Sequence, residues 1–216
     1  KLIPIETLIK KYKNIFDDAK DELKNITLEN LQSRIRGTIL MAISNNENSL
    51  LLTTGNKSEL SVGYCTLYGD MNGGLNIIGD IYKTEVFSLA KWIDEKMNPQ
   101  IRKEYGLPID GEIIGKQIRF KEPSAELSEG QKDSDSLPKY NLLDPILKEI
   151  IDKKLSLKEL ISKGYDEDLC IKILKLVANS EFKRKQAAPI LRVSERAFGM
   201  GWRMPIAAKK QNWENL

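Results

Sequence analysis

The segment "SLLLTTGNKSE" constrains the fold more than any other part of the chain. It is a short apolar run that stops at Thr54-Gly55 and continues directly into polar and charged residues. A continuous apolar run of this kind is typical of a strand buried on both faces of a parallel sheet. In open α/β sheets, ligands bind in the crevice above the carboxyl ends of the strands. The polar turn after the run is therefore predicted to border a ligand site.

Helical and strand-like segments alternate around this run. Apolar residues suggest a helix from Ile5 to Lys20, and they recur at helical spacing after Thr27, a plausible N-cap. The motif "NNEN" is expected to end this second helix. A second short strand is expected at Leu75–Ile78, followed by a helix from about Lys83 to Lys96. This order predicts an α/β fold, with a parallel sheet flanked by helices.

From residue 98 to about 140 the periodic pattern dissolves. Residues 121–140 are rich in Ser, Asp, Lys, Gly and Pro, and long segments without regular structure inside a compact domain are usually functional or mobile. We therefore expect a mobile lid loop at 121–140. Two apolar stripes after it predict a helical C-terminal part: Leu143, Ile146, Leu147, Ile150 and Ile151, then Leu169, Ile173, Leu174 and Val177.

The composition excludes several kinds of chemistry. The 216 residues include no histidine and two cysteines, so a His-based zinc site, a four-thiolate site and Ser-His-Asp catalysis cannot be built from this sequence. A net charge of +3 suits small anionic ligands but is too low to favour a nucleic-acid partner, despite the basic "FKRK" segment. The sequence has no apolar run long enough for a membrane span, and the unpaired cysteines favour a cytoplasmic setting.

The polar turn itself has two open interpretations. Glu59 could bind Mg²⁺ while Lys57 neutralises phosphate charge. Alternatively, Asn56 caps the next helix and Glu59 lies in its first turn, where an acidic residue is favourable. The two interpretations are compatible with each other.

Other candidates have functional and purely structural interpretations as well. Asn30 and Arg34 share a helix face and could hold a phosphate or carboxylate, or Arg34 could pair with Glu29 at the surface. Lys83 opposes the helix dipole at a helix start, which favours a nearby anion, unless it extends into water. Acidic and hydroxyl residues of the loop could bind a cation or sugar hydroxyls, or only keep it soluble: Ser124, Glu126, Asp133 and Asp135.

Four segments in order resemble the synthetase domain of NAD⁺ synthetases, which are N-type ATP pyrophosphatases. They are "ENLQSRIRGTILMAISN", "LLTTGNKSELSVGYCTLYGDMNGGLNIIGDIYKTEVF", "EPSAELSEGQKDSDSLPKYNLLDPIL" and "EFKRKQAAPILRVSERAFG". The resemblance runs from about Ile3 to Ile206, and "GYCTLYGDM" and the tail are similar to the glutamine-dependent branch. It implies a Rossmann-like, adenine nucleotide alpha hydrolase-like sheet in a homodimer.

The resemblance also implies an activity. The family uses ATP and Mg²⁺ to convert deamido-NAD⁺ into NAD⁺ through an adenylated intermediate. Pyrophosphate and AMP are released, and the nitrogen comes from free ammonia or from glutamine.

Residue roles follow by motif. Glu59 resembles a Mg²⁺ ligand, and Lys83 resembles a contact to the ATP phosphates, so these two are the expected catalytic residues. Gly55 and Ser124 resemble parts of the ATP site. The expected contacts to deamido-NAD⁺ are Asn30, Arg34, Lys57 and Asp70, with Asp133, Asp135 and Lys183 on the lid and the tail. Phe182 stands where some relatives carry a histidine.

One family motif is missing from this sequence. The phosphate loop, of the form S-G-G-x-D-S, occurs nowhere in it and is expected to precede Lys1. We therefore expect residues 1–216 to be the C-terminal portion of a single synthetase domain. The alternative is an inactive nucleotide-binding fragment or a partner subunit of the same superfamily.

Overall fold

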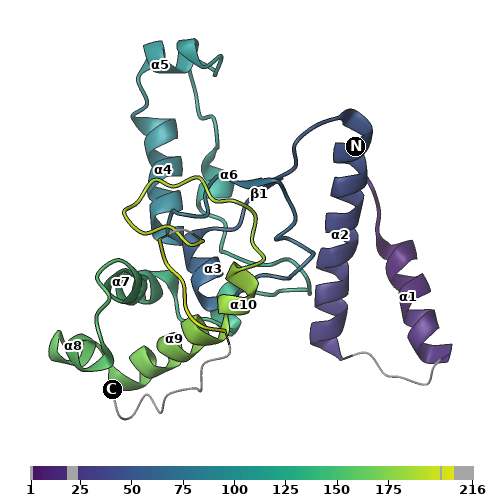
Figure 1. Cartoon of the computed structure of the whole chain (residues 1–216). Coiled ribbons are helices and arrows are strands. Elements are labelled where there is room, and N and C mark those ends of the chain that lie inside the picture. Colours follow the sequence, from purple (N-terminus) through teal and green to yellow (C-terminus); the bar gives the residue numbers. More distant parts are fainter. Residues whose placement is uncertain (1, 19–23, 200, 207–216) are drawn as a thin grey trace.

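The structure is a computed structural model that describes residues 2–18, 24–199 and 201–206. Two helices form an N-terminal arm, and short strands alternate with helices after it (Figure 1). The elements are α1 (Glu6–Asp18), α2 (Asn25–Glu47), β1 (Leu52–Thr53), α3 (Lys57–Val62), β2 (Leu75–Asn76), α4 (Lys83–Glu95), α5 (Pro99–Glu104), α6 (Lys116–Arg119), the 3₁₀ helix η1 (Asp133–Asp135), α7 (Tyr140–Ile151), α8 (Leu157–Ser162), α9 (Glu167–Asn179) and α10 (Glu181–Arg184).

The N-terminal arm is close to its prediction. Helix α1 lies along α2, on the side away from the other helices (Figure 1). Helix α2 begins at Asn25 with Lys24 as its N-cap, so the prediction of Thr27 as N-cap is wrong: Thr27 lies within the first turn. The predicted end at "NNEN" is confirmed, because Asn48 adopts the left-handed conformation and closes the helix.

The sheet is parallel, as predicted, but small. Leu52 lies opposite Leu75 and Thr53 opposite Asn76. The C-terminal segment continues the sheet beyond β2, because Asn76 N donates to Pro189 O and Leu191 N donates to Asn76 O. The prediction of a strand buried on both faces is wrong for Leu52, which is 43% exposed. Among the described residues, one face of this small sheet is therefore partly exposed at Leu52.

The hydrophobic core lies among α3, α7, α8 and α9. Both apolar stripes predicted for the C-terminal part face this core, with Leu143, Leu147 and Ile173 completely buried. Helix α3 contacts both α7 and α9, so the polar turn that begins α3 rests directly on this core.

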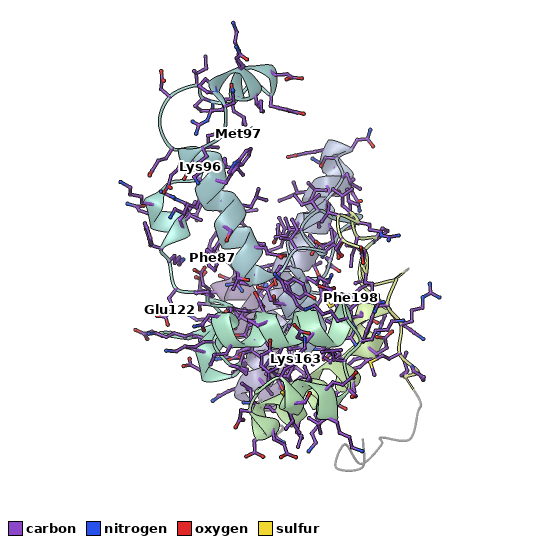
Figure 2. All side chains as sticks on the ribbon, turned by 90° about the vertical axis from the view of Figure 1, so that its left-hand side faces the viewer. Phe87, Lys96, Met97, Glu122, Lys163 and Phe198 are labelled. Atoms are coloured by element: carbon purple, nitrogen blue, oxygen red, sulfur yellow. The ribbon has the colours of Figure 1, made fainter. Side chains whose placement is uncertain are left out.

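The region after α4 is more ordered than the sequence predicts. Arg102 is buried and donates to the carbonyls of Ile93, Asp94 and Gly111. The Asp94 carboxylate accepts three backbone N–H groups from 113–115. These bonds fix α5 at the far end of α4, beyond Lys96 and Met97, and hold α6 alongside α4 (Figure 2). The sequence pattern missed these helices because polar bonds, not apolar periodicity, hold them.

Segment 121–140 packs against the arm and the core at several points. Gln32 Nε2 donates to Leu127 O at 2.8 Å, and Leu137 is buried in the core. The mobility of this lid remains a prediction.

No described helix is both long enough and apolar enough to cross a membrane.

Candidate functional site

The turn after β1 is built as a capping box. Asn56 Oδ1 accepts from Glu59 N, and Glu59 Oε2 accepts from Asn56 N, both at 3.0 Å. The capping interpretation of this turn is therefore confirmed. The other oxygen of Glu59, Oε1, lies 2.9 Å from Lys83 Nζ. Each of these two side chains remains partly accessible, with 17% of Glu59 and 20% of Lys83 exposed.

Hydrogen bonds hold the starts of α3 and α4 together. Ser58 Oγ accepts from Lys83 N at 2.8 Å and donates to Asp144 Oδ1 at 2.6 Å. The other Asp144 oxygen accepts from Thr84 N and Thr84 Oγ1. The Lys83 cation also lies over the ring of Tyr140, 5.5 Å from its centroid. The carboxylate of Glu59 thus supplies the anion that a lysine at a helix start requires.

Residues 63–72 form a loop that gathers three more of the predicted site residues. Asn30 Oδ1 accepts from Thr66 Oγ1 at 2.9 Å, and Arg34 Nε donates to Leu67 O at 3.2 Å. Asp70 Oδ1 accepts from Thr66 N at 2.6 Å. Asn30 and Arg34 therefore reach this loop from α2, and Asp70 binds Thr66 from within the loop.

The loop approaches α2 closely, and glycine makes that possible. A Cβ atom on Gly37 would lie 2.7 Å from Gly69 O, and one on Gly69 would lie 2.3 Å from Ser33 Oγ. Both distances are shorter than a carbon–oxygen contact allows. The position of Asp70 thus depends on these two glycines.

Lys183 joins the loop from the C-terminal side. Its Nζ donates to Gly63 O and to Cys65 O, each at 2.7 Å. Gly55 and Asp70 line a small cavity at the end of β1, together with Cys65 and Asn76. Burial raises the pKa of the Cys65 thiol to about 12. Burial also raises the pKa of the Asp70 carboxyl, against the effect of its hydrogen bond from Thr66 N.

The lid residues divide into two groups. Asp133 is buried and accepts from the Tyr140 hydroxyl at 2.8 Å, while its Oδ1 has no hydrogen-bond partner among the described residues. Burial raises the pKa of Tyr64 most, and the charges of Asp133, Glu29 and Glu59 raise it further, so these carboxylates all act on the same buried hydroxyl.

Ser124 and Asp135 serve local turns. Ser124 Oγ accepts from Glu126 N, and Asp135 Oδ2 accepts from Lys132 N. In the described part of the chain, no hydrogen bond or ion pair joins either residue to Glu59 or Lys83.

The structure contradicts the prediction for Lys57. Its side chain is completely buried, and its Nζ lies 3.1 Å from Asp80 Oδ1, 3.1 Å from Asp152 Oδ1 and 3.0 Å from Ser194 Oγ. The expectation that Lys57 lines a ligand site is wrong for this structure, because Nζ already contacts three protein oxygens away from solvent.

A family model described as NAD synthase matches residues 1–187. The chain belongs to the NAD synthase family. The glutamine-dependent NAD(+) synthetase of Synechocystis sp. is 50% identical over 209 residues, which are 95% of this chain and 34% of that protein. The enzyme of the same name from Thermotoga maritima is 43% identical over 214 residues, covering 95% of this chain and 35% of that protein. The chain thus spans about a third of the length of these curated relatives.

Solved structures of the NAD synthase family show the fold. A glutamine-dependent NAD(+) synthetase from Cytophaga hutchinsonii matches 94% of this chain and 33% of its own, with a TM-score of 0.69 and 25% identity. An NH₃-dependent NAD synthetase from Campylobacter jejuni is similar in fold, with a TM-score of 0.54 and 24% identity over 84% of this chain and 60% of its own. The Rossmann-like α/β prediction is confirmed.

Three further residues lie at the candidate site although the sequence did not predict them: Tyr64, Tyr140 and Asp144. Tyr140 donates to Asp133, the charge of Asp133 helps to raise the pKa of the buried Tyr64 hydroxyl after burial itself, and Asp144 fixes the starts of α3 and α4. No local sequence pattern marks them, since their roles arise from contacts across the core.

The residues present could supply only part of the ligand shell of a magnesium ion. Among the described residues, no three acidic or thiol side chains cluster as a preformed metal site. However, Mg²⁺ bound through ATP phosphates needs only one or two carboxylates. Glu59 suits that role, because each of its oxygens accepts one protein donor and keeps a second lone pair.

Proposed function

We propose that this chain forms part of an NAD⁺ synthetase that amidates deamido-NAD⁺ to NAD⁺ at the expense of ATP. The observation that supports the proposal best is the Glu59–Lys83 pair at the ends of the two parallel strands, in a chain of the NAD synthase family. The reaction would pass through an adenylated deamido-NAD⁺ and release pyrophosphate and AMP.

The Glu59–Lys83 pair would serve the ATP side of the reaction. Lys83 would contact the phosphates and stabilise the charge that develops as pyrophosphate leaves. Glu59 would hold Mg²⁺, which when bound supplies further neutralisation of that charge. Gly55 would border the nucleotide, because it follows β1 and lines the cavity there.

The loop at 63–72 would serve the deamido-NAD⁺ side. Asn30, Arg34 and Asp70 already meet on this loop, and Lys183 binds its carbonyls from the tail. Asp133 would join them from the lid, since it lies beside Tyr64 and Tyr140. Ser124 and Asp135 would reach the ligands only after the lid segment at 121–140 moves.

The nitrogen source and the assembly are also proposals. The names of the curated relatives specify glutamine, so we propose that glutamine supplies the nitrogen in the complete protein and that free ammonia can replace it. We further propose a homodimer that works in the cytoplasm, without a nucleic-acid or membrane partner.

Titration and turnover together test this function. Deamido-NAD⁺ and Mg-ATP are titrated calorimetrically into the full-length protein that carries this chain, and AMP is measured in the same solution after ammonium is added. Binding of both ligands with AMP formation supports the synthetase. Binding without AMP supports the inactive nucleotide-binding alternative, and absence of binding contradicts both.

A further inference from the structure

We infer that Lys57 is a positioning residue, which sets the geometry of the Glu59–Lys83 pair from a buried site; this inference rests on the proposed function of that pair. Lys57 and Glu59 belong to the same turn, but their side chains have different environments. Glu59 is partly accessible, while Lys57 has no exposed surface. A buried lysine is costly unless it is paired and hydrogen-bonded, so its partners define what it does.

Two contacts of Lys57 join the turns that follow the strands. These strand-end turns are residues 56–59 after β1 and residues 80–83 after β2. Lys57 N donates to Ile81 O at 2.9 Å, and Lys57 Nζ pairs with Asp80 Oδ1 at 3.1 Å. These two contacts lie beside the bond from Lys83 N to Ser58 Oγ. Both turns are thus fixed to each other over consecutive residues, and Glu59 and Lys83 are the last members of this series.

Further contacts bring in the C-terminal segment and the core helix. Asp80 Oδ2 accepts from Val193 N and Ser194 N, and Asp80 Oδ1 accepts from Ser194 Oγ. Lys57 Nζ also pairs with Asp152, the residue after α7, whose other oxygen accepts from the Tyr82 hydroxyl. Lys57 therefore connects four separate parts of the chain at one buried cation.

Lys57 affects how precisely Glu59 and Lys83 are positioned relative to each other. Removing the Lys57 cation leaves Asp80 as a buried carboxylate without its ion pair, and the 80–83 turn loses a contact to the 56–59 turn. The Glu59–Lys83 distance is then set by fewer contacts. In this role Lys57 touches no substrate and acts through Asp80 and the two turns.

The test compares two variants with a matched control. Lys57→Met removes the cation, and Lys57→Met/Asp80→Asn removes both charges and so avoids the orphaned carboxylate. Arg119→Met is the control, because Arg119 is a buried cation paired with the buried Asp94, away from the strand-end turns. The readout is the rate of amine labelling at Lys83, followed by mass spectrometry, with Lys163 as the internal reference.

We expect Lys83 to be labelled several-fold faster in both Lys57 variants and at the wild-type rate in Arg119→Met. We also expect kcat for AMP formation to fall about ten- to a hundredfold in the double variant even if its stability recovers. Wild-type labelling of Lys83 in the double variant overturns the inference. If the wild-type protein forms no AMP, the proposed function fails, and the labelling rates still decide the role of Lys57.

Discussion

Lys83 Nζ and Glu59 Oε1 lie 2.9 Å apart, although 24 residues separate them in the sequence. They meet because β1 and β2 are parallel neighbours whose carboxyl ends lead into α3 and α4. Glu59 also accepts from Asn56 N, so one carboxylate serves the helix cap and the candidate catalytic pair. Stability and catalysis can therefore be separated by substitution at this residue.

Glu59→Gln is expected to reduce the use of Mg-ATP far more than it reduces stability. Glutamine preserves the capping box, so the free energy of unfolding should change by less than about 1 kcal/mol. The amide is a poor magnesium ligand and cannot pair with Lys83. AMP formation at varied Mg²⁺ and chemical denaturation measure the two effects. Unchanged turnover would remove Glu59 from the metal site.

Lys83→Met is expected to slow the adenylation step by about 10²–10³-fold, the usual effect of losing a group that stabilises developing charge. Methionine keeps the aliphatic length of the side chain but removes the ammonium, so the ion pair with Glu59 and the cation–π contact with the Tyr140 ring are both lost. Pyrophosphate release in a single turnover measures this step directly. Lys91→Met, on the exposed surface of α4, is the control. An unaltered single-turnover rate in Lys83→Met would contradict the assignment.

The sequence predicted the elements whose signals are local or periodic. The stripes of α7 and α9, the parallel strands and the polar turn after β1 all follow from apolar spacing. Asn56 and Glu59 were also interpretable, since a capping box is a local pattern. The environment of Lys57 was not, because Asp80, Asp152 and Ser194 meet it only after the chain has folded. A lysine that binds phosphate and a lysine that binds buried aspartates look identical in sequence.

Gly37→Ala is expected to destabilise the protein, although alanine is the better helix former by about 1 kcal/mol. The new methyl group would lie 2.7 Å from the backbone oxygen of Gly69, and a backbone atom cannot rotate away as a flexible side chain can. We expect a net loss of about 1–3 kcal/mol, the usual effect of overpacking. Thermal unfolding checks this, and a stabilised variant would show that the loop moves freely. The displaced loop should also weaken binding of deamido-NAD⁺.

Asp70→Asn is expected to lower turnover without lowering stability at pH 7. Burial raises the pKa of Asp70, so the folded state binds its proton more tightly than the unfolded state does. The ionised carboxylate therefore lowers stability at pH 7, and that penalty disappears as the pH falls to about 4, the unfolded pKa. Asparagine should match or exceed the wild type in stability at pH 7 and lose this advantage near pH 4. Turnover should fall, because the proposed contact to deamido-NAD⁺ loses its charge. A variant that is less stable at pH 7 yet fully active would contradict both expectations.

Asp80→Asn is expected to weaken the acid dependence of folding. Burial alone would raise the pKa of Asp80, but the hydrogen bonds from Val193 N and Ser194, with that from Lys57, hold it below the ordinary value. A carboxyl with a lowered folded pKa stabilises the protein above its unfolded pKa, about 3.9, and loses that contribution as the pH falls through the folded value. The variant should therefore be less stable than the wild type at pH 7, and the difference should shrink progressively below about pH 4. Denaturant titrations from neutral to acidic pH measure the difference, with Asp110→Asn at the exposed surface as the control. A difference that stays constant over this range would show that the Asp80 charge does not contribute to stability.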